Sequence, residues 1–126
     1  MTQVAGMTVL VVDDEPFVAM LITDVLEDLG CATIDASQAA MALDVLRSDR
    51  CVDLMITDIG LPGGMNGRQL ATQARALRPK LNILFVTGYA HGGGLDEAPL
   101  DEGMQVITKP FAMEALEQRV RDMLGD

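Results

Sequence analysis

The sequence contains few aromatic residues, few cations, one histidine and two cysteines. Among its 126 residues there is no Trp and a single Tyr, and Lys plus Arg number 9 against 19 for Asp plus Glu, which gives a net charge of -10. Nucleic-acid binding depends on basic residues that neutralise phosphates, and anionic membranes attract clusters of Lys and Arg. We therefore expect no direct contact with nucleic acid or with a membrane surface.

Signals for export and for metal binding by thiols are also missing. Residues 1–6 do not form the basic segment that precedes the apolar stretch of a signal peptide. No apolar run approaches the roughly 20 residues that cross a bilayer. Cys31 and Cys51 do not have the spacing of metal ligands, so free thiols in a reducing compartment are expected. These absences predict a cytoplasmic protein.

The residues that are present alternate between two patterns. Short apolar runs rich in Val, Ile and Leu are followed by segments with helical spacing, and runs without polar alternation are typical of strands buried on both faces. The alternation predicts one α/β domain over residues 1–126, with a core at about 7–124 and a doubly wound, five-stranded parallel sheet. The expected strands are 8–12, 32–36, 54–57, 83–86 and 105–108, and the expected helices are 16–29, a helix capped by Ser37 that runs to Leu46, 68–78 and 113–123.

One helical unit is weak. Residues 90–103 contain three consecutive glycines and Pro99, which are poor helix formers, so the fourth helix is expected to be short or irregular. Only two residues follow Leu124. We therefore expect no output domain after the helix, and a signal that passes to a separate partner.

Polar residues follow four of the predicted strands at the point where each strand ends. They are Asp13 and Asp14 after the first strand, Asp58 after the third, Thr87 after the fourth and Lys109 after the fifth. In an open α/β sheet, ligands bind beyond the carboxyl ends of the strands. The topology therefore predicts that three carboxylates, a hydroxyl and an ammonium group meet at one edge.

Carboxylates at such close range repel one another. Two unit charges about 4 Å apart interact by roughly 4 kcal/mol at an effective dielectric of about 20. A hard cation with oxygen ligands, such as Mg2+, removes this cost and can neutralise the oxygens of a phosphoryl group. A carboxylate can also accept that group covalently, while Lys109 and Thr87 offer a positive charge and a hydroxyl donor.

Four ordered motifs at the strand ends resemble the signatures of bacterial response regulator receiver domains, over about Met7 to Leu124. This resemblance implies a flavodoxin-like sheet with strand order 2-1-3-4-5 and a role as a phosphoacceptor in two-component or phosphorelay signal transduction, without turnover of a separate substrate. The expected donor is a histidine kinase or a histidine phosphotransfer protein. The motifs are Val11-Val12-Asp13-Asp14-Glu15, Ile56-Thr57-Asp58-Ile59-Gly60-Leu61-Pro62, Val86-Thr87-Gly88 and Thr108-Lys109-Pro110-Phe111.

The resemblance also implies a role for each residue of the site. Asp58 would be the phosphoacceptor. Asp14, Asp58 and the backbone carbonyl of Gly60 would bind Mg2+ directly, and Asp13 would hold the ion through water. Thr87 and Lys109 would contact the phosphoryl group.

The sequence departs from the usual receiver pattern at three places. Gly67, which closes the loop after Asp58, comes one residue later than in chemotaxis regulators. Val106 occupies the position, three before the lysine, at which many receivers carry an aromatic switch residue. Tyr89 can serve either as a packing residue or as a switch alongside Thr87. The glycine-rich segment 90–103 replaces a clear fourth helix, as in receivers attached to hybrid histidine kinases.

Two other classes of protein were weighed against this interpretation. A phosphohydrolase resembling the haloacid dehalogenases would use an aspartyl nucleophile and an acid two residues later, where this chain has Gly60. A flavodoxin-like FMN binder would need a hydroxyl-rich phosphate loop after the first strand, where this chain has Asp13, Asp14 and Glu15. Turnover of free phosphoesters would favour the first class, and a coloured purified protein the second.

Overall fold

A parallel sheet of five strands forms the centre of the molecule, with strand order β2-β1-β3-β4-β5. The computed structural model of the chain describes residues 5–61, 63–87, 102–108 and 111–124. The strand order and the parallel pairing confirm the predicted doubly wound fold. In chain order the elements are β1 (Thr8–Val12), α1 (Pro16–Asp28), β2 (Ala32–Ala36), α2 (Ala39–Arg47), β3 (Leu54–Asp58), α3 (Gly67–Leu77), β4 (Asn82–Thr87), β5 (Met104–Thr108) and α5 (Met113–Leu124).

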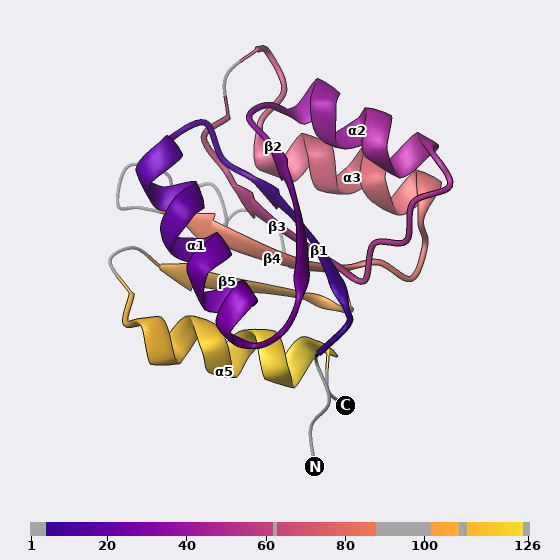
Figure 1. Ribbon diagram of the computed structural model, residues 1–126. Helices are drawn as coiled ribbons and strands as arrows, with labels where there is room; N and C mark the ends of the chain where they lie inside the picture. Colours follow the sequence, from indigo (N-terminus) through magenta and orange to yellow (C-terminus); the bar gives the residue numbers. More distant parts are fainter. Residues whose placement is uncertain (1–4, 62, 88–101, 109–110, 125–126) are drawn as a thin grey trace.

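Helices cover both faces of the sheet, and each face has its own apolar core. Helices α1 and α5 lie on one face, while α2 and α3 lie on the other (Figure 1). Successive residues of a strand point to opposite faces. Leu10 accordingly packs in the core with Leu43, whereas Val9 packs in the core with Ile22 and Leu116. Burial on both faces explains why the central strands β1, β3 and β4 are largely apolar. The edge strands β2 and β5 carry exposed polar residues, among them Asp35 and Gln105.

The bounds of most elements follow from local signals in the sequence. Pro16 occupies the first turn of α1, where its missing N–H costs nothing. Gly30 follows this helix with φ of 87°, a conformation that favours glycine. Observed bounds differ from the predicted ones by a residue or two at several ends.

Most of the segment 90–103, where a short or irregular helix was predicted, lies outside the described residues. Among the residues described, no helix has the length and apolarity needed to cross a membrane.

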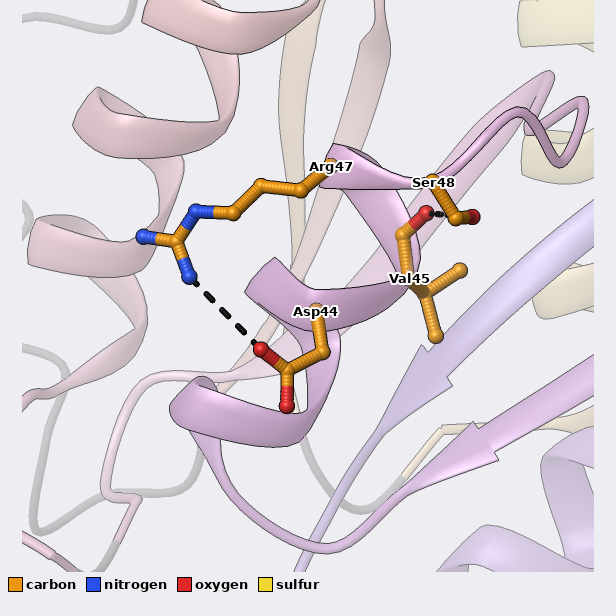
Figure 2. Close-up of polar contacts among 4 residues, drawn as sticks. All are labelled: Asp44, Val45, Arg47 and Ser48. Atoms are coloured by element: carbon orange, nitrogen blue, oxygen red, sulfur yellow. Dashed lines mark hydrogen bonds and ion pairs between the residues drawn. The ribbon is translucent and has the colours of Figure 1, made fainter.

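The prediction that Ser37 caps α2 is wrong. The residue at the N-cap is Gln38, which makes no side-chain capping bond. Ser37 lies one position too early, and its hydroxyl donates to Met41 Sδ at 3.2 Å. Figure 2 shows the other end of α2, where Ser48 Oγ donates to the carbonyl of Val45 at 2.5 Å. The Arg47–Asp44 ion pair of this turn spans 3.6 Å and is exposed, so it adds little stability.

Helix α3 begins with a capping box. The Asn66 side chain accepts a bond from the Gln69 amide at 2.9 Å, and Gln69 Oε1 accepts one from the Asn66 amide at 2.9 Å. Both bonds satisfy amides that the first turn of a helix leaves without partners. The Asn-x-x-Gln spacing of residues 66–69 is the sequence signal of this cap.

Replacing Asn66 by Ala should lower the free energy of unfolding by about 1 kcal/mol, because the cap is lost. Urea unfolding followed by circular dichroism measures the change. Gln73→Ala is the matched control, since Gln73 is an exposed amide on the same helix. Equal stability of Asn66→Ala and the wild type would show that the capping box contributes nothing.

Candidate functional site

The polar residues singled out in the sequence lie at the carboxyl edge of the sheet. In the register of the parallel strands, Val12 of β1 pairs with Thr57 of β3. One residue further along each chain come Asp13 and Asp58, so these two residues lie level at the same edge. Asp58 in turn pairs with Val86 of β4, and the next residue of β4 is Thr87.

Three carboxylates come together at this edge. Asp13, Asp14 and Asp58 each place a carboxylate oxygen within 4.8 Å of the other two. Asp13 and Asp58 are both only 5% exposed, whereas Asp14 is exposed to solvent. The prediction that these side chains meet is confirmed. The donor set contains oxygen alone, without sulfur or imidazole, and therefore fits a hard cation such as Mg2+.

Backbone amides orient two of the three carboxylates. The Glu15 amide donates to Asp13 Oδ1 at 2.9 Å, and the Gly60 amide donates to Asp58 Oδ1 at 3.3 Å. Both bonds run from residue i+2 back to the aspartate, the pattern of an Asx turn. Helix α1 has Glu15 as its N-cap, without a side-chain capping bond. The turn at Asp13 therefore presents this carboxylate to the pocket and does not cap the helix.

The loop after Asp58 closes on the backbone beside that residue. The Ile59 carbonyl accepts bonds from the Leu61 amide at 3.0 Å and the Gly67 amide at 2.8 Å. Gly63 and Gly64 both have φ of 87°, a conformation that L residues with side chains rarely adopt. Two consecutive glycines thus let a loop with one extra residue return to the end of β3.

Of the remaining predicted site residues, the structure describes Thr87 and Val106. Thr87 is 2% exposed at the end of β4 and pairs with Thr108 at the end of β5. Val106 is partly buried and packs against the core under α2 and α3. Lys109 and Tyr89 lie outside the described residues. The structure thus brings Asp13, Asp14 and Asp58 together, with Thr87 on the adjacent strand.

The cysteines lie apart from this edge. Cys31 is buried directly before β2, at the amino edge of the sheet, and Cys51 is exposed. Burial raises the pKa of the Cys31 thiol, and the Asp53 carboxylate raises it further. Both residues are free thiols, which confirms that expectation.

Comparison with known proteins gives matches over most of the chain. A family model described as the response regulator receiver domain matches residues 9–121. The sensor kinase CckA of Brucella abortus is 30% identical over 118 residues, which are 93% of this chain and 12% of that kinase. The CheY homolog of Campylobacter jejuni, a chemotaxis protein, is 30% identical over 122 residues, covering 94% of this chain and 93% of the homolog.

Solved structures give the same result. The crystal structure of a response regulator receiver protein from Sinorhizobium medicae superposes with a TM-score of 0.84 at 28% identity, and the match covers 94% of each chain. The receiver domain of the hybrid histidine kinase CckA superposes with a TM-score of 0.77 at 24% identity. Both structures share the fold of this chain.

Proposed function

Because the chain belongs to the response regulator receiver domain family, we propose that Asp58 is the residue that accepts its phosphoryl group. Receivers of two-component systems are phosphoacceptor signalling modules and not true enzymes, and they work with histidine kinases and phosphotransferases. The observation that carries the proposal is the triad. Asp58 ends the central strand β3 and shares its pocket with Asp13 and Asp14.

The transfer step needs a nucleophilic oxygen at the open end of the pocket. A carboxylate oxygen of Asp58 attacks the phosphorus of a phosphohistidine, and the bond from phosphorus to the imidazole nitrogen breaks. The bonding pair returns to the imidazole, and the product is an aspartyl phosphate. The Gly60 amide, which donates to Asp58 Oδ1 at 3.3 Å, helps to orient the carboxylate for in-line attack.

The same carboxylates would hold Mg2+. We assign Asp14, Asp58 and the Gly60 carbonyl as direct ligands and Asp13 as a ligand through water. Support comes from the oxygen-only donor set and from the clustering of the three carboxylates. When bound, the ion offsets their repulsion and the charge on the phosphoryl oxygens. Asp13 and Asp58 are buried, so their charges are poorly screened by water.

Thr87 and Lys109 are proposed to contact the phosphoryl group in the product. Thr87 offers a hydroxyl donor from the strand next to Asp58, and Lys109 directly follows β5. The new charge at Asp58 would shift a two-state equilibrium through Thr87, with Tyr89 and Val106 as further switch candidates. The readout passes to a protein partner.

The donor proposed for this chain is a histidine kinase or a histidine phosphotransfer protein in the cytoplasm. The similarity to part of a sensor kinase and to the receiver domain of a hybrid histidine kinase supports a histidine kinase as the donor. The net charge of -10 argues against nucleic acid as the partner. The proposed module is a single domain over residues 1–126.

A small phosphoramidate donor tests the function directly. With Mg2+ present, the intact mass of the chain should rise by one phosphoryl group, and excess EDTA should prevent this rise. Phosphotransfer profiling against purified histidine kinases then identifies the cognate donor. A chain that stays unmodified in Mg2+, or that turns over free phosphoesters, would contradict the proposed role.

A further inference from the structure

Two residues to which receiver chemistry assigns no task hold the two peptide groups that follow Asp58, Asp58–Ile59 and Ile59–Gly60. The hydroxyl of Thr57 donates to the Asp58 carbonyl oxygen at 2.9 Å, and Thr57 is completely buried. The first residue of α3, Gly67, donates its amide to the Ile59 carbonyl at 2.8 Å. The Thr57 hydroxyl and the first residue of α3 therefore both bond to the backbone next to Asp58.

Gly67 approaches this backbone more closely than any other residue type could. A Cβ added at Gly67 would lie 2.9 Å from Ile59 Cα and 3.0 Å from the Asp58 carbonyl carbon, and nearer still to the Asp58 carbonyl oxygen. Gly67 does not have a positive φ, so its backbone conformation alone does not require glycine. The requirement comes from contact between the start of α3 and the Asp58–Ile59 peptide.

This peptide determines where the reacting groups point. The Asp58 side chain leaves the Cα beside the held carbonyl, and the Gly60 amide that bonds Asp58 Oδ1 comes two residues later. A methyl group at Gly67 must therefore displace either α3 or this backbone, because the contacts with Asp58 and Ile59 are shorter than a Cβ atom can make. A catalytic arrangement tolerates about 0.5 Å of displacement before it loses efficiency.

We propose that Thr57 and Gly67 are positioning residues for phosphoryl transfer. They hold the Asp58–Ile59 and Ile59–Gly60 peptides so that the Asp58 carboxylate and the Gly60 backbone keep the relative placement that the reaction needs. The inference rests on the proposed phosphoacceptor role of Asp58. It adds that position 67 requires glycine because of this contact, although alanine is in general the better helix former.

The experiment compares Gly67→Ala, Thr57→Val and Thr57→Ser in the phosphoramidate assay. Thr57→Val removes the hydroxyl at nearly constant shape, and Thr57→Ser restores it. Two variants serve as matched controls. Gly64→Ala strains a positive φ of 87° in the same loop without a neighbour within 4 Å. Thr72→Val removes a hydroxyl that donates to the Arg68 carbonyl at 3.2 Å within α3.

The readouts are the rate constant at saturating donor and Mg2+, the Mg2+ concentration at half-saturation, and the unfolding temperature. We expect the rate constant of Gly67→Ala to fall by about 10- to 100-fold, the loss that a displacement of roughly 1 Å can cause. The rate constant of Thr57→Val should fall by several-fold, and that of Thr57→Ser should return to most of the wild-type value. Both controls should keep their rate constants, and Gly64→Ala should lower the unfolding temperature because of its positive φ.

The outcomes separate this inference from the phosphoacceptor role. Lower unfolding temperatures with wild-type rate constants in both Gly67→Ala and Thr57→Val would overturn the positioning role and leave Asp58 as acceptor. A wild-type chain that takes no label would overturn the phosphoacceptor role itself. If Gly67→Ala does not fold, the Thr57→Val and Thr57→Ser pair decides the question.

Discussion

Asp58→Asn should not become phosphorylated at all, because an asparagine side chain has no carboxylate oxygen to attack phosphorus. The substitution keeps the size and shape of the side chain, so β3 and its register should remain. Asn can still accept the bond from the Gly60 amide that now reaches Asp58 Oδ1 at 3.3 Å. Intact-mass measurement after incubation with a phosphoramidate and Mg2+ should show the unmodified chain, while the wild type gains one phosphoryl group.

The control for this substitution removes one negative charge from the same edge of the sheet. Asp35 is an exposed carboxylate near the end of β2, and it accepts a bond from Thr23 Oγ1 at 3.5 Å. Asp35→Asn should be phosphorylated nearly as fast as the wild type. Label that persists in Asp58→Asn, located by peptide mapping on another residue, would remove Asp58 from its role as acceptor.

The sequence determined the fold well because the strong signals were local. Strands β1, β3 and β4 contain continuous apolar runs that end at a polar residue, while β2 and β5 are short segments with exposed polar residues such as Asp35 and Gln105. The carboxyl ends of parallel strands share one edge, so the sequence alone predicts that Asp13 and Asp58 lie together. The 4.8 Å cluster with Asp14 confirms that step.

Other features depend on contacts that the sequence pattern does not encode. Ser37 and Gln38 both precede α2, and the helix begins one residue later than a cap at Ser37 would require. Gly67 looks like an ordinary loop glycine, yet its role comes from an approach to Asp58 across the intervening loop. Thr57 looks like a β-favouring residue within a buried strand. Contacts with neighbouring backbone, and not local propensity, are the basis of the positioning role proposed for these two residues.

Asp14→Asn should raise the unfolding temperature in the absence of Mg2+. It should also reduce the further rise that Mg2+ produces. The three carboxylates lie within 4.8 Å of one another, so neutralising one of them relieves repulsion when no cation is bound. Mg2+ binding to the folded wild type should raise its unfolding temperature, since a ligand at 100 times its dissociation constant adds about 2.7 kcal/mol. Asp14→Asn should lose most of that rise because one proposed direct ligand is gone.

Thermal unfolding in a Mg2+ titration, without any phosphoryl donor, measures both effects independently of phosphorylation. Asp14 is exposed, so its substitution should leave the core packing intact. Asp35→Asn again serves as the charge control and should keep the full response to Mg2+. Equal Mg2+ responses in Asp14→Asn and the wild type would mean that the ion binds elsewhere. The three clustered carboxylates would then have to be explained without a metal.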